Sequence, residues 1–153
     1  MRRWVSRLVP LAFLVGCLAL SLTCADLPRS ESAPTPRDGV FLHISSGQES
    51  PHRVLMALKM AELMTEDRDV IVYFDIKGIE VVLADAPNIQ HATFPSSHDQ
   101  IQNLLDLSVP LYACPGCLQA AGKTPDDLRA GIQVANKDAF FDFTDGRILT
   151  LDY

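Results

Sequence analysis

From residue 39 to the C-terminus, short apolar runs alternate with segments of helical periodicity. The apolar runs predict five strands, over 40–44, 70–74, 109–113, 132–135 and 147–151. The intervening segments predict helices or helical turns over 53–64, 79–84, 98–107, 117–121 and 137–143, with a capped helix start at 124–128. Because the strand runs are apolar without alternation, we expect them to be buried on both faces, as parallel strands between helix layers are. The order of elements therefore predicts a three-layer α/β domain with a mainly parallel five-stranded sheet.

The N-terminus has a different pattern, that of a secretory signal peptide over residues 1–25. Three arginines precede an apolar run from Leu8 to Thr23 that is interrupted only by Pro10, Gly16 and Ser21. The run is short for a membrane-spanning helix, which needs about 20 apolar residues. A basic segment followed by a short apolar one is typical of export. We therefore expect a periplasmic protein.

Two ways of processing this signal remain open from the sequence. Leu14 to Cys17 resembles the site at which bacterial lipoproteins are acylated on a cysteine, although apolar residues would then follow the lipid. Cys24 is better placed but matches that pattern less well, whereas Thr23-Cys24-Ala25 fits ordinary cleavage after small residues. The exported chain is thus expected to be either soluble or anchored by a lipid.

Residues 26–38 predict a flexible linker, and residues 39–153 the folded domain. The linker combines three prolines with serine and charged residues, a composition that cannot bury a core. Loss of the three signal-peptide arginines would change the formal net charge of the chain from −6 to −9. So acidic a domain, without a basic stripe, is unsuited to nucleic acid or anionic lipid headgroups.

The segment most suited to chemistry is Cys114-Pro115-Gly116-Cys117. It begins directly after a predicted strand and leads into a predicted helix, where unpaired backbone N–H groups can stabilise a thiolate. In open parallel sheets the reactive groups lie beyond the carboxyl ends of the strands. Cys114 and Cys117 are therefore the candidate catalytic residues, as an attacking and a resolving thiol or as a disulfide.

Two other uses of a Cys-x-x-Cys motif fit this chain less well. A thioredoxin-like motif follows the first main strand, whereas here two complete strand–helix units precede Cys114. A tetrahedral zinc site needs four ligands, and no second cysteine pair or His-x-x-x-His spacing is present. We expect no metal and no cofactor. An inert structural disulfide remains an alternative for the pair.

The domain from about Gly39 to Tyr153 resembles the DsrE/DsrF-like family of sulfur-relay proteins. The resemblance rests on the opening GVFLHISSGQESPHRVLMALKMAELM, on VIVYFDIKGIEVVLAD, and on VPLYACPGCLQAAG followed by DLRAGIQVAN. It implies a flavodoxin-like three-layer fold, assembly into homotrimers or hexamers, and protein partners in sulfur or thiol transfer. The matching cysteine of sulfur-relay members, here Cys114, carries a persulfide. Cys117 is an additional thiol.

Together these observations predict an exported sulfur or thiol carrier that uses Cys114, with at most sulfurtransferase-like or thiol–disulfide exchange activity. Export departs from the cytoplasmic relay members, and an oxidising compartment favours a disulfide, which cannot hold a persulfide until it is reduced. The alternative is a non-catalytic exported α/β module that binds a small ligand or a protein partner.

Several further residues have less specific interpretations. His43 is expected to be a hydrogen-bonded core histidine rather than a ligand, and 45–47 a plain turn rather than an anion cradle. Asp75 either lines the same cleft as Cys114 or caps the next turn. His98 and Asp99 are expected to begin a helix. The three phenylalanines of 140–143 are expected to form core and subunit contacts.

Overall fold

The computed structural model describes residues 35–153, so the predicted signal peptide, with Cys17 and Cys24, lies outside the described residues. Five parallel strands form one sheet in the order β4-β3-β2-β1-β5. They are β1 (Gly39–Ile44), β2 (Asp69–Phe74), β3 (Leu111–Ala113), β4 (Gln133–Val134) and β5 (Ile148–Asp152). The predicted three-layer, flavodoxin-like α/β fold with a parallel five-stranded sheet is confirmed.

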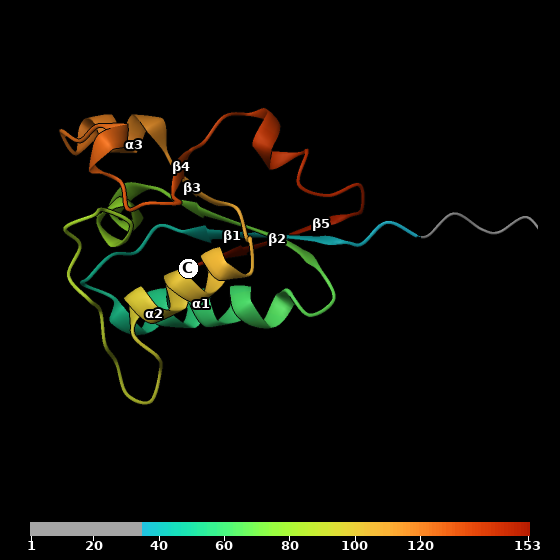
Figure 1. Cartoon of the computed structure of the whole chain (residues 1–153), viewed down its shortest axis with the longest axis horizontal. Helices are drawn as coiled ribbons and strands as arrows, with labels where there is room; N and C mark the ends of the chain where they lie inside the picture. Colours follow the sequence, from blue (N-terminus) through green and yellow to red (C-terminus); the bar gives the residue numbers. More distant parts are fainter. Residues whose placement is uncertain (1–34) are drawn as a thin grey trace, which may run out of the picture. The chain divides into compact units, whose positions relative to one another are not determined.

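Helices cover both faces of the sheet, but unequally (Figure 1). The two longest, α1 (Pro51–Met64) and α2 (Ser97–Asp106), lie together on one face. The other face carries only the short α3 (Pro115–Ala120) and the segment with the 3-10 turn η3 (Asp138–Phe140). The remaining turns are η1 (Ile76–Val81) and η2 (Pro125–Asp127). None of the helices within residues 35–153 is long and apolar enough to cross a membrane.

The core lies between the sheet and the α1–α2 layer. In β1, Val40, Leu42 and Ile44 are buried, whereas Phe41 and His43 between them are half-buried. Side chains alternate between the two faces of a strand, so the buried set packs against α1 and the other set faces the thinner α3 layer. The second face is therefore the one on which polar groups can approach solvent.

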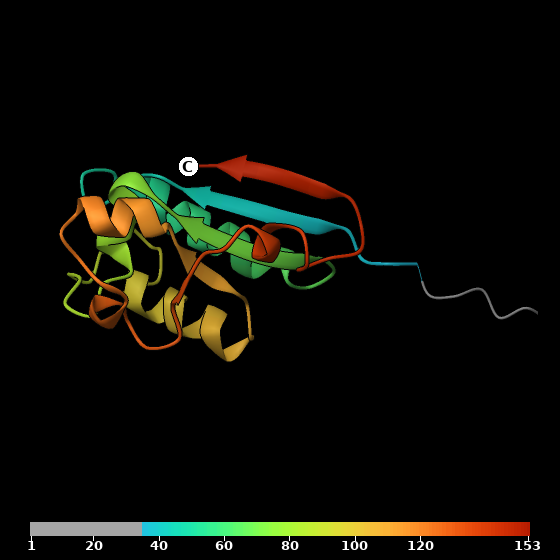
Figure 2. The ribbon, with the colours of Figure 1, turned by 90° about the horizontal axis from the view of Figure 1, so that it is seen from above.

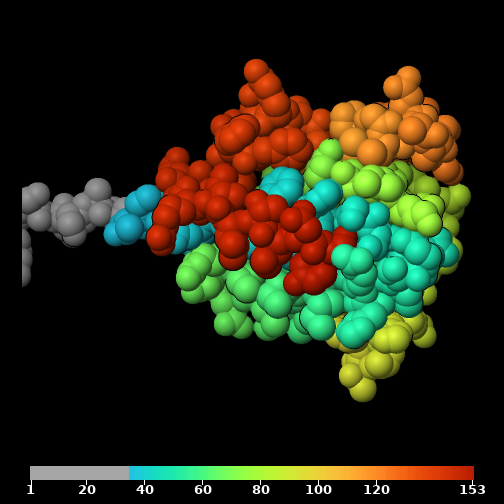
Figure 3. Space-filling view, turned by 180° about the vertical axis from the view of Figure 1, so that it is seen from behind, coloured from blue at the N-terminus to red at the C-terminus, as the bar shows by residue number. Residues whose placement is uncertain are grey.

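The closing strand departs from the prediction that all strands are buried on both faces. Ile148 and Leu149 of β5 are 42% and 55% exposed. The reason is position: β5 pairs only with β1 and forms an edge of the sheet, which lies open at the surface in Figure 3. Because an edge strand has a neighbouring strand on one side only, its side chains are less buried than those of an inner strand.

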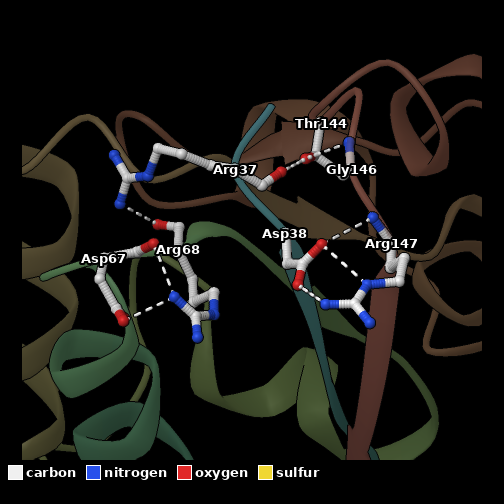
Figure 4. A network of polar contacts seen from close by, with 7 residues as sticks. All are labelled: Arg37, Asp38, Asp67, Arg68, Thr144, Gly146 and Arg147. Atoms are coloured by element: carbon white, nitrogen blue, oxygen red, sulfur yellow. Dashed lines mark hydrogen bonds and ion pairs between the residues drawn. The ribbon is translucent and has the colours of Figure 1, made fainter. Parts of the chain in front are cut away.

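Ion pairs and hydrogen bonds link the segments that precede the strands, at the end of the sheet where the strands begin (Figure 4). Arg147 before β5 contacts both carboxylate oxygens of Asp38 before β1, at 2.6 and 3.2 Å. The Arg37 guanidinium donates to the carbonyls of Thr65 and Arg68 at 3.1 and 2.7 Å. The last residues of the predicted linker are thus bound to the domain. A cavity of about 320 Å³ lies beside Arg37, and neither Cys114 nor Cys117 lines it.

At the carboxyl-terminal edge, the turn after β2 packs directly against the end of β1. The Gly78 N–H donates to the Asp75 carbonyl at 2.6 Å. A Cβ atom on Gly78 would lie 2.1 Å from the carbonyl oxygen of Ile44, so only glycine permits this approach. The contact fixes where Asp75 and Ile76 stand relative to β1.

We predict that Gly78→Ala destabilises the domain by about 1–3 kcal/mol, because the added methyl group forces backbone away from backbone. Urea denaturation followed by circular dichroism measures the loss. Gly116→Ala is the matched control, since nothing lies within 4 Å of its added Cβ and alanine favours the helix. Equal denaturation midpoints for the two variants would contradict the prediction.

Candidate thiol site at the carboxyl-terminal edge of the sheet

One row of side chains crosses the whole sheet near its carboxyl-terminal edge. Across the sheet from β5 to β4, the parallel register places these residues side by side: Asp152, His43, Tyr73, Tyr112 and Gln133. Residues two positions further along point to the same face. Asp75 and Cys114 therefore follow Tyr73 and Tyr112 on the α3 face. Figure 2 shows β1, β2 and β5 pointing towards the end of the domain where α3 lies.

Cys114 occupies the junction that the sequence predicts. Its N–H donates to the Phe74 carbonyl at 2.8 Å, which extends the β2–β3 pairing by one residue. Its extended backbone and its sulfur make it the N-cap of α3, with Pro115 at the first helical position. The Cys117 N–H donates to Cys114 Sγ at 3.3 Å. The helix thus begins at Pro115, two residues before the predicted start at Cys117, and the Cys114 thiol caps it.

The surroundings of Cys114 favour its thiolate. Partial burial by itself raises the pKa of this thiol, but hydrogen bonds from the Tyr73 hydroxyl and from Cys117 and Gly116 outweigh it. The pKa of Cys114 therefore lies below its ordinary value. Hydrogen bonds to the charged form of an acid stabilise that form, and a thiolate is the reactive state of cysteine.

Cys117 differs from Cys114 in its ionisation. The Ile76 N–H, hydrogen-bonded to Cys117, acts to lower the pKa of this thiol. The neighbouring Cys114 thiol, partial burial and the negative charge of Asp75 act together in the opposite direction, so the pKa of Cys117 lies above its ordinary value. Both cysteines are free thiols in this structure. The pair therefore consists of one thiolate-forming residue and one residue that keeps its proton.

Ile76 adopts an unusual backbone conformation beside this pair. Its φ is +47°, in the left-handed region that costs a non-glycine residue about 1–2 kcal/mol. Its side chain is 65% exposed, so burial does not offset the cost. Strained residues cluster at functional sites. Ile76 and Cys117 border an open groove of about 410 Å³, which Lys77, Ala120 and Ala121 also line.

His43 lies between two carboxylates rather than in the core. Its Nδ1 is 2.8 Å from Asp152, its Nε2 is 2.8 Å from Asp75, and its ring stacks on Tyr73 with centroids 5.8 Å apart. Partial burial lowers the pKa of His43, but its contacts with Asp152 and Asp75 outweigh it and raise the pKa above the ordinary value. The prediction of a core histidine missed this arrangement, while Asp75 does line the edge that holds Cys114.

The other residues that the sequence brought forward have local roles. Donors of the 45–47 turn are engaged within the domain, as expected of a plain turn. Ser45 donates to the Tyr153 carbonyl, and the Gly47 N–H donates to the Glu49 carboxylate at 3.1 Å. His98 and Asp99 begin α2 as predicted, with Ser96 as the cap. Phe140 packs edge-on against Phe41 and Tyr73, which covers part of the second face.

The described residues do not bring three histidine, cysteine or acidic side chains together in a way that could hold a metal ion. Sequence reasoning passed over Tyr73 and Asp152 as site residues. The available signal was the two-residue alternation that puts Tyr73 on the same face as Asp75, but it requires the strand order to be known.

The family model described as the DsrE/DsrF-like family matches residues 39–147, which include the whole site. This chain belongs to the DsrE/DsrF-like family. Among curated proteins, none matches the sequence.

Solved structures with the same fold come from a bacterium and an archaeon. The YchN protein of E. coli is similar with a TM-score of 0.58 and 14% identity, over 75% of this chain and 99% of that one. MTH1491 of Methanobacterium thermoautotrophicum, a protein of unknown function, is similar with a TM-score of 0.52 and 16% identity, over the same shares. At these identities the likeness concerns the fold alone.

We predict that Tyr73→Phe raises the pKa of Cys114, because the substitution removes a hydrogen bond that stabilises the thiolate. The rate of Cys114 alkylation by iodoacetamide near pH 7 should fall several-fold. The measurement is a pH–rate profile followed on the Cys114 peptide by mass spectrometry.

Tyr112→Phe is the control, because it removes the hydroxyl of the next tyrosine in the same row. Its profile should match that of the parent chain. An unchanged profile for Tyr73→Phe would show that the hydroxyl does not stabilise the thiolate.

Proposed function

We propose that this protein is a sulfur carrier in which Cys114 accepts a sulfur atom and Cys117 resolves the product. The observation that carries the proposal is the difference between the two thiols: Cys114 receives hydrogen bonds that stabilise its thiolate, while Asp75 and Cys114 disfavour ionisation of Cys117. Membership of the DsrE/DsrF-like family supports a role related to sulfur relay. The activity is sulfurtransferase-like, or thiol–disulfide exchange, without a cofactor.

The loading step needs a persulfide donor, a molecule that carries an outer sulfur on its thiol. The Cys114 thiolate attacks that outer sulfur, a new bond forms at Cys114 Sγ, and the bond within the donor breaks. The donor thiolate leaves with the electron pair, so no external oxidant or reductant is consumed. The N–H groups at the start of α3 and the Tyr73 hydroxyl, which stabilise the Cys114 thiolate, also stabilise Cys114 as a leaving group when sulfur moves on.

The loaded sulfur then has two routes. An acceptor protein's thiolate attacks the outer sulfur and displaces Cys114 as a thiolate. Alternatively, the Cys117 thiolate attacks Cys114 Sγ, which releases hydrosulfide and leaves a Cys114–Cys117 disulfide. A dithiol reductant must then reduce this disulfide before a new cycle. The higher pKa of Cys117 slows the second route, because little of Cys117 is ionised near neutral pH.

We further propose that the protein works in the periplasm, either soluble or anchored by a lipid on Cys17 or Cys24. The basic and apolar pattern of residues 1–25 supports this location. There the dithiol reductant decides whether Cys114 is free to load. The redox state of the pair in the native compartment is thus part of the function.

The proposal includes a homotrimer or homohexamer that meets protein partners at the thiol edge. Support comes from apolar side chains exposed on β5, where Leu149 and Met64 border an open cavity of about 440 Å³. Phe141 is also exposed, at 71%. Exposed apolar groups at a sheet edge commonly mark contacts between chains.

We predict that the purified chain, incubated with a small-molecule persulfide, gains the mass of one sulfur atom on the Cys114 peptide. Cys114→Ser should abolish this gain. Cys117→Ser should retain it and prolong its lifetime, because the route to the disulfide is removed. Peptide mass spectrometry after alkylation measures each state, and Cys114→Ser also leaves Cys117 as a matched thiol control.

Equal labelling of Cys117 in the Cys114→Ser chain would contradict the assigned roles. Absence of added sulfur on Cys114 in the parent chain, with its thiol shown to be reduced, would favour a non-catalytic binding module instead.

We predict that Leu149→Glu lowers the oligomeric state without unfolding the domain. Its side chain is more exposed than buried, so the folded subunit tolerates a charge that an apolar contact between subunits does not. Light scattering coupled to size-exclusion chromatography measures the mass. The control is Thr150→Glu on the other face of the same strand, and a monomeric parent chain would contradict the assembly.

A further inference from the structure

The thiol pair has a third ionisable partner on the same face of the sheet. His43 stands beside Tyr73 in the cross-strand row, and Asp75 follows Tyr73 by two residues on the same face of the sheet. The negative charge of Asp75 acts on both Cys117 and Tyr73. A carboxylate whose charge acts on a thiol pair disfavours thiolate formation unless a positive charge offsets it, because like charges oppose each other's ionisation.

The surroundings of His43 provide that charge by geometry. Carboxylate oxygens lie 2.8 Å from each of the two ring nitrogens, Asp152 on one side and Asp75 on the other. A neutral imidazole has one N–H group, whereas the imidazolium has two and a positive charge, so only the charged ring presents a proton to both carboxylates at once. The Nε2 contact is an ion pair rather than an aligned hydrogen bond, which makes its strength depend on charge.

The same ring also positions Tyr73. The His43 and Tyr73 rings are stacked, with 29° between their planes, and Phe140 packs edge-on against the tyrosine ring, with centroids 5.0 Å apart. Tyr73 is thereby held in the orientation in which its hydroxyl reaches Cys114. Removal of the imidazole would free one side of this ring.

We propose that His43 is a positioning residue of the thiol site: clamped between Asp152 and Asp75, its charged ring offsets the Asp75 carboxylate beside the thiols and holds Tyr73 against Cys114. The proposal rests on Cys114 as the reactive thiol, as proposed above, and adds the control of its ionisation. As the pH rises and His43 loses its proton, Asp75 is left uncompensated and the Cys114 thiolate becomes less favoured.

The charged and titratable groups of His43 and of the thiol pair come from several segments. Asp152 belongs to β5, Tyr73 and Asp75 to β2 and the turn after it, and the two thiols to the start of α3. Across the turn, Lys77 pairs with Glu49 at 4.0 Å. Asp75 and Asp152 are the two whose charges act on His43, and both favour its protonated form.

The test is the pH–rate profile of Cys114 alkylation by iodoacetamide in the full chain, followed on the Cys114 peptide. His43→Gln should slow alkylation near pH 7 about three- to tenfold, the effect of losing a nearby opposite charge. Adding Asp75→Asn to His43→Gln should restore most of the rate, because it removes the charge that His43 offsets. His52→Gln, at an exposed histidine of α1, is the control and should leave the profile unchanged.

Two results would overturn the proposal. One is a His43→Gln profile that superimposes on that of the parent chain. The other is a slow His43→Gln chain whose rate Asp75→Asn does not restore, since a purely steric role for the ring would give that pattern.

If His43→Gln fails to fold, Asp152→Asn provides the test, because that side chain is 69% exposed and its replacement spares the packing. It should move the His43-dependent inflection of the profile to lower pH, and an unmoved inflection would overturn the proposal. Alkylation uses no sulfur donor, so a failure of persulfide loading leaves this outcome readable on its own.

Discussion

The in-register pairing of five parallel strands is the constraint on which the thiol site depends. Register fixes which residues are neighbours across the sheet, and alternation fixes which of them share a face. A slip of one residue in β2 would turn Tyr73 and Asp75 towards α1 and bring Phe74 to the α3 face. The site would then lose both its hydroxyl donor and its carboxylate. The packing of β1 and β2 against α1 therefore also determines the chemistry on the opposite face.

The thin cover on that opposite face has a physical consequence. The buried residues of β1 and β2 meet two full helices, whereas His43 and Tyr73 meet only short elements and remain partly accessible. Ionisable groups can stay charged there, because solvent and neighbouring charges offset the cost of burial. A domain with long helices on both faces would bury the same row, and His43 between its two carboxylates would carry a much larger desolvation cost. Reactivity and incomplete cover are linked in this fold.

Local sequence patterns were sufficient for the elements but not for the site. Apolar runs and helical spacing located the five strands and the two main helices, and placed the start of α3 within two residues of Pro115. The partners of Cys114 depend on long-range pairing: His43 and Asp152 are 109 residues apart in the chain. Nothing local indicates that β5 returns to lie beside β1, so the sequence alone favours a core position for His43. The same missing information hid the exposure of β5, because an edge strand and an inner strand can have the same apolar sequence.

The difference between the two thiols bears on how the proposed carrier could stay active in the proposed periplasmic location. In a disulfide of Cys114 with Cys117, an attacking thiolate does best to strike Cys117, because Cys114 is then expelled as the more stable thiolate. Stabilising the reduced form of one cysteine also makes the disulfide easier to reduce, as the oxidising thiol–disulfide proteins illustrate. The hydrogen bonds at Cys114 thus oppose the tendency of the compartment to lock the pair. The same groups that would make Cys114 a good acceptor of sulfur would keep it recoverable, so the proposed periplasmic location and the proposed carrier role are chemically compatible.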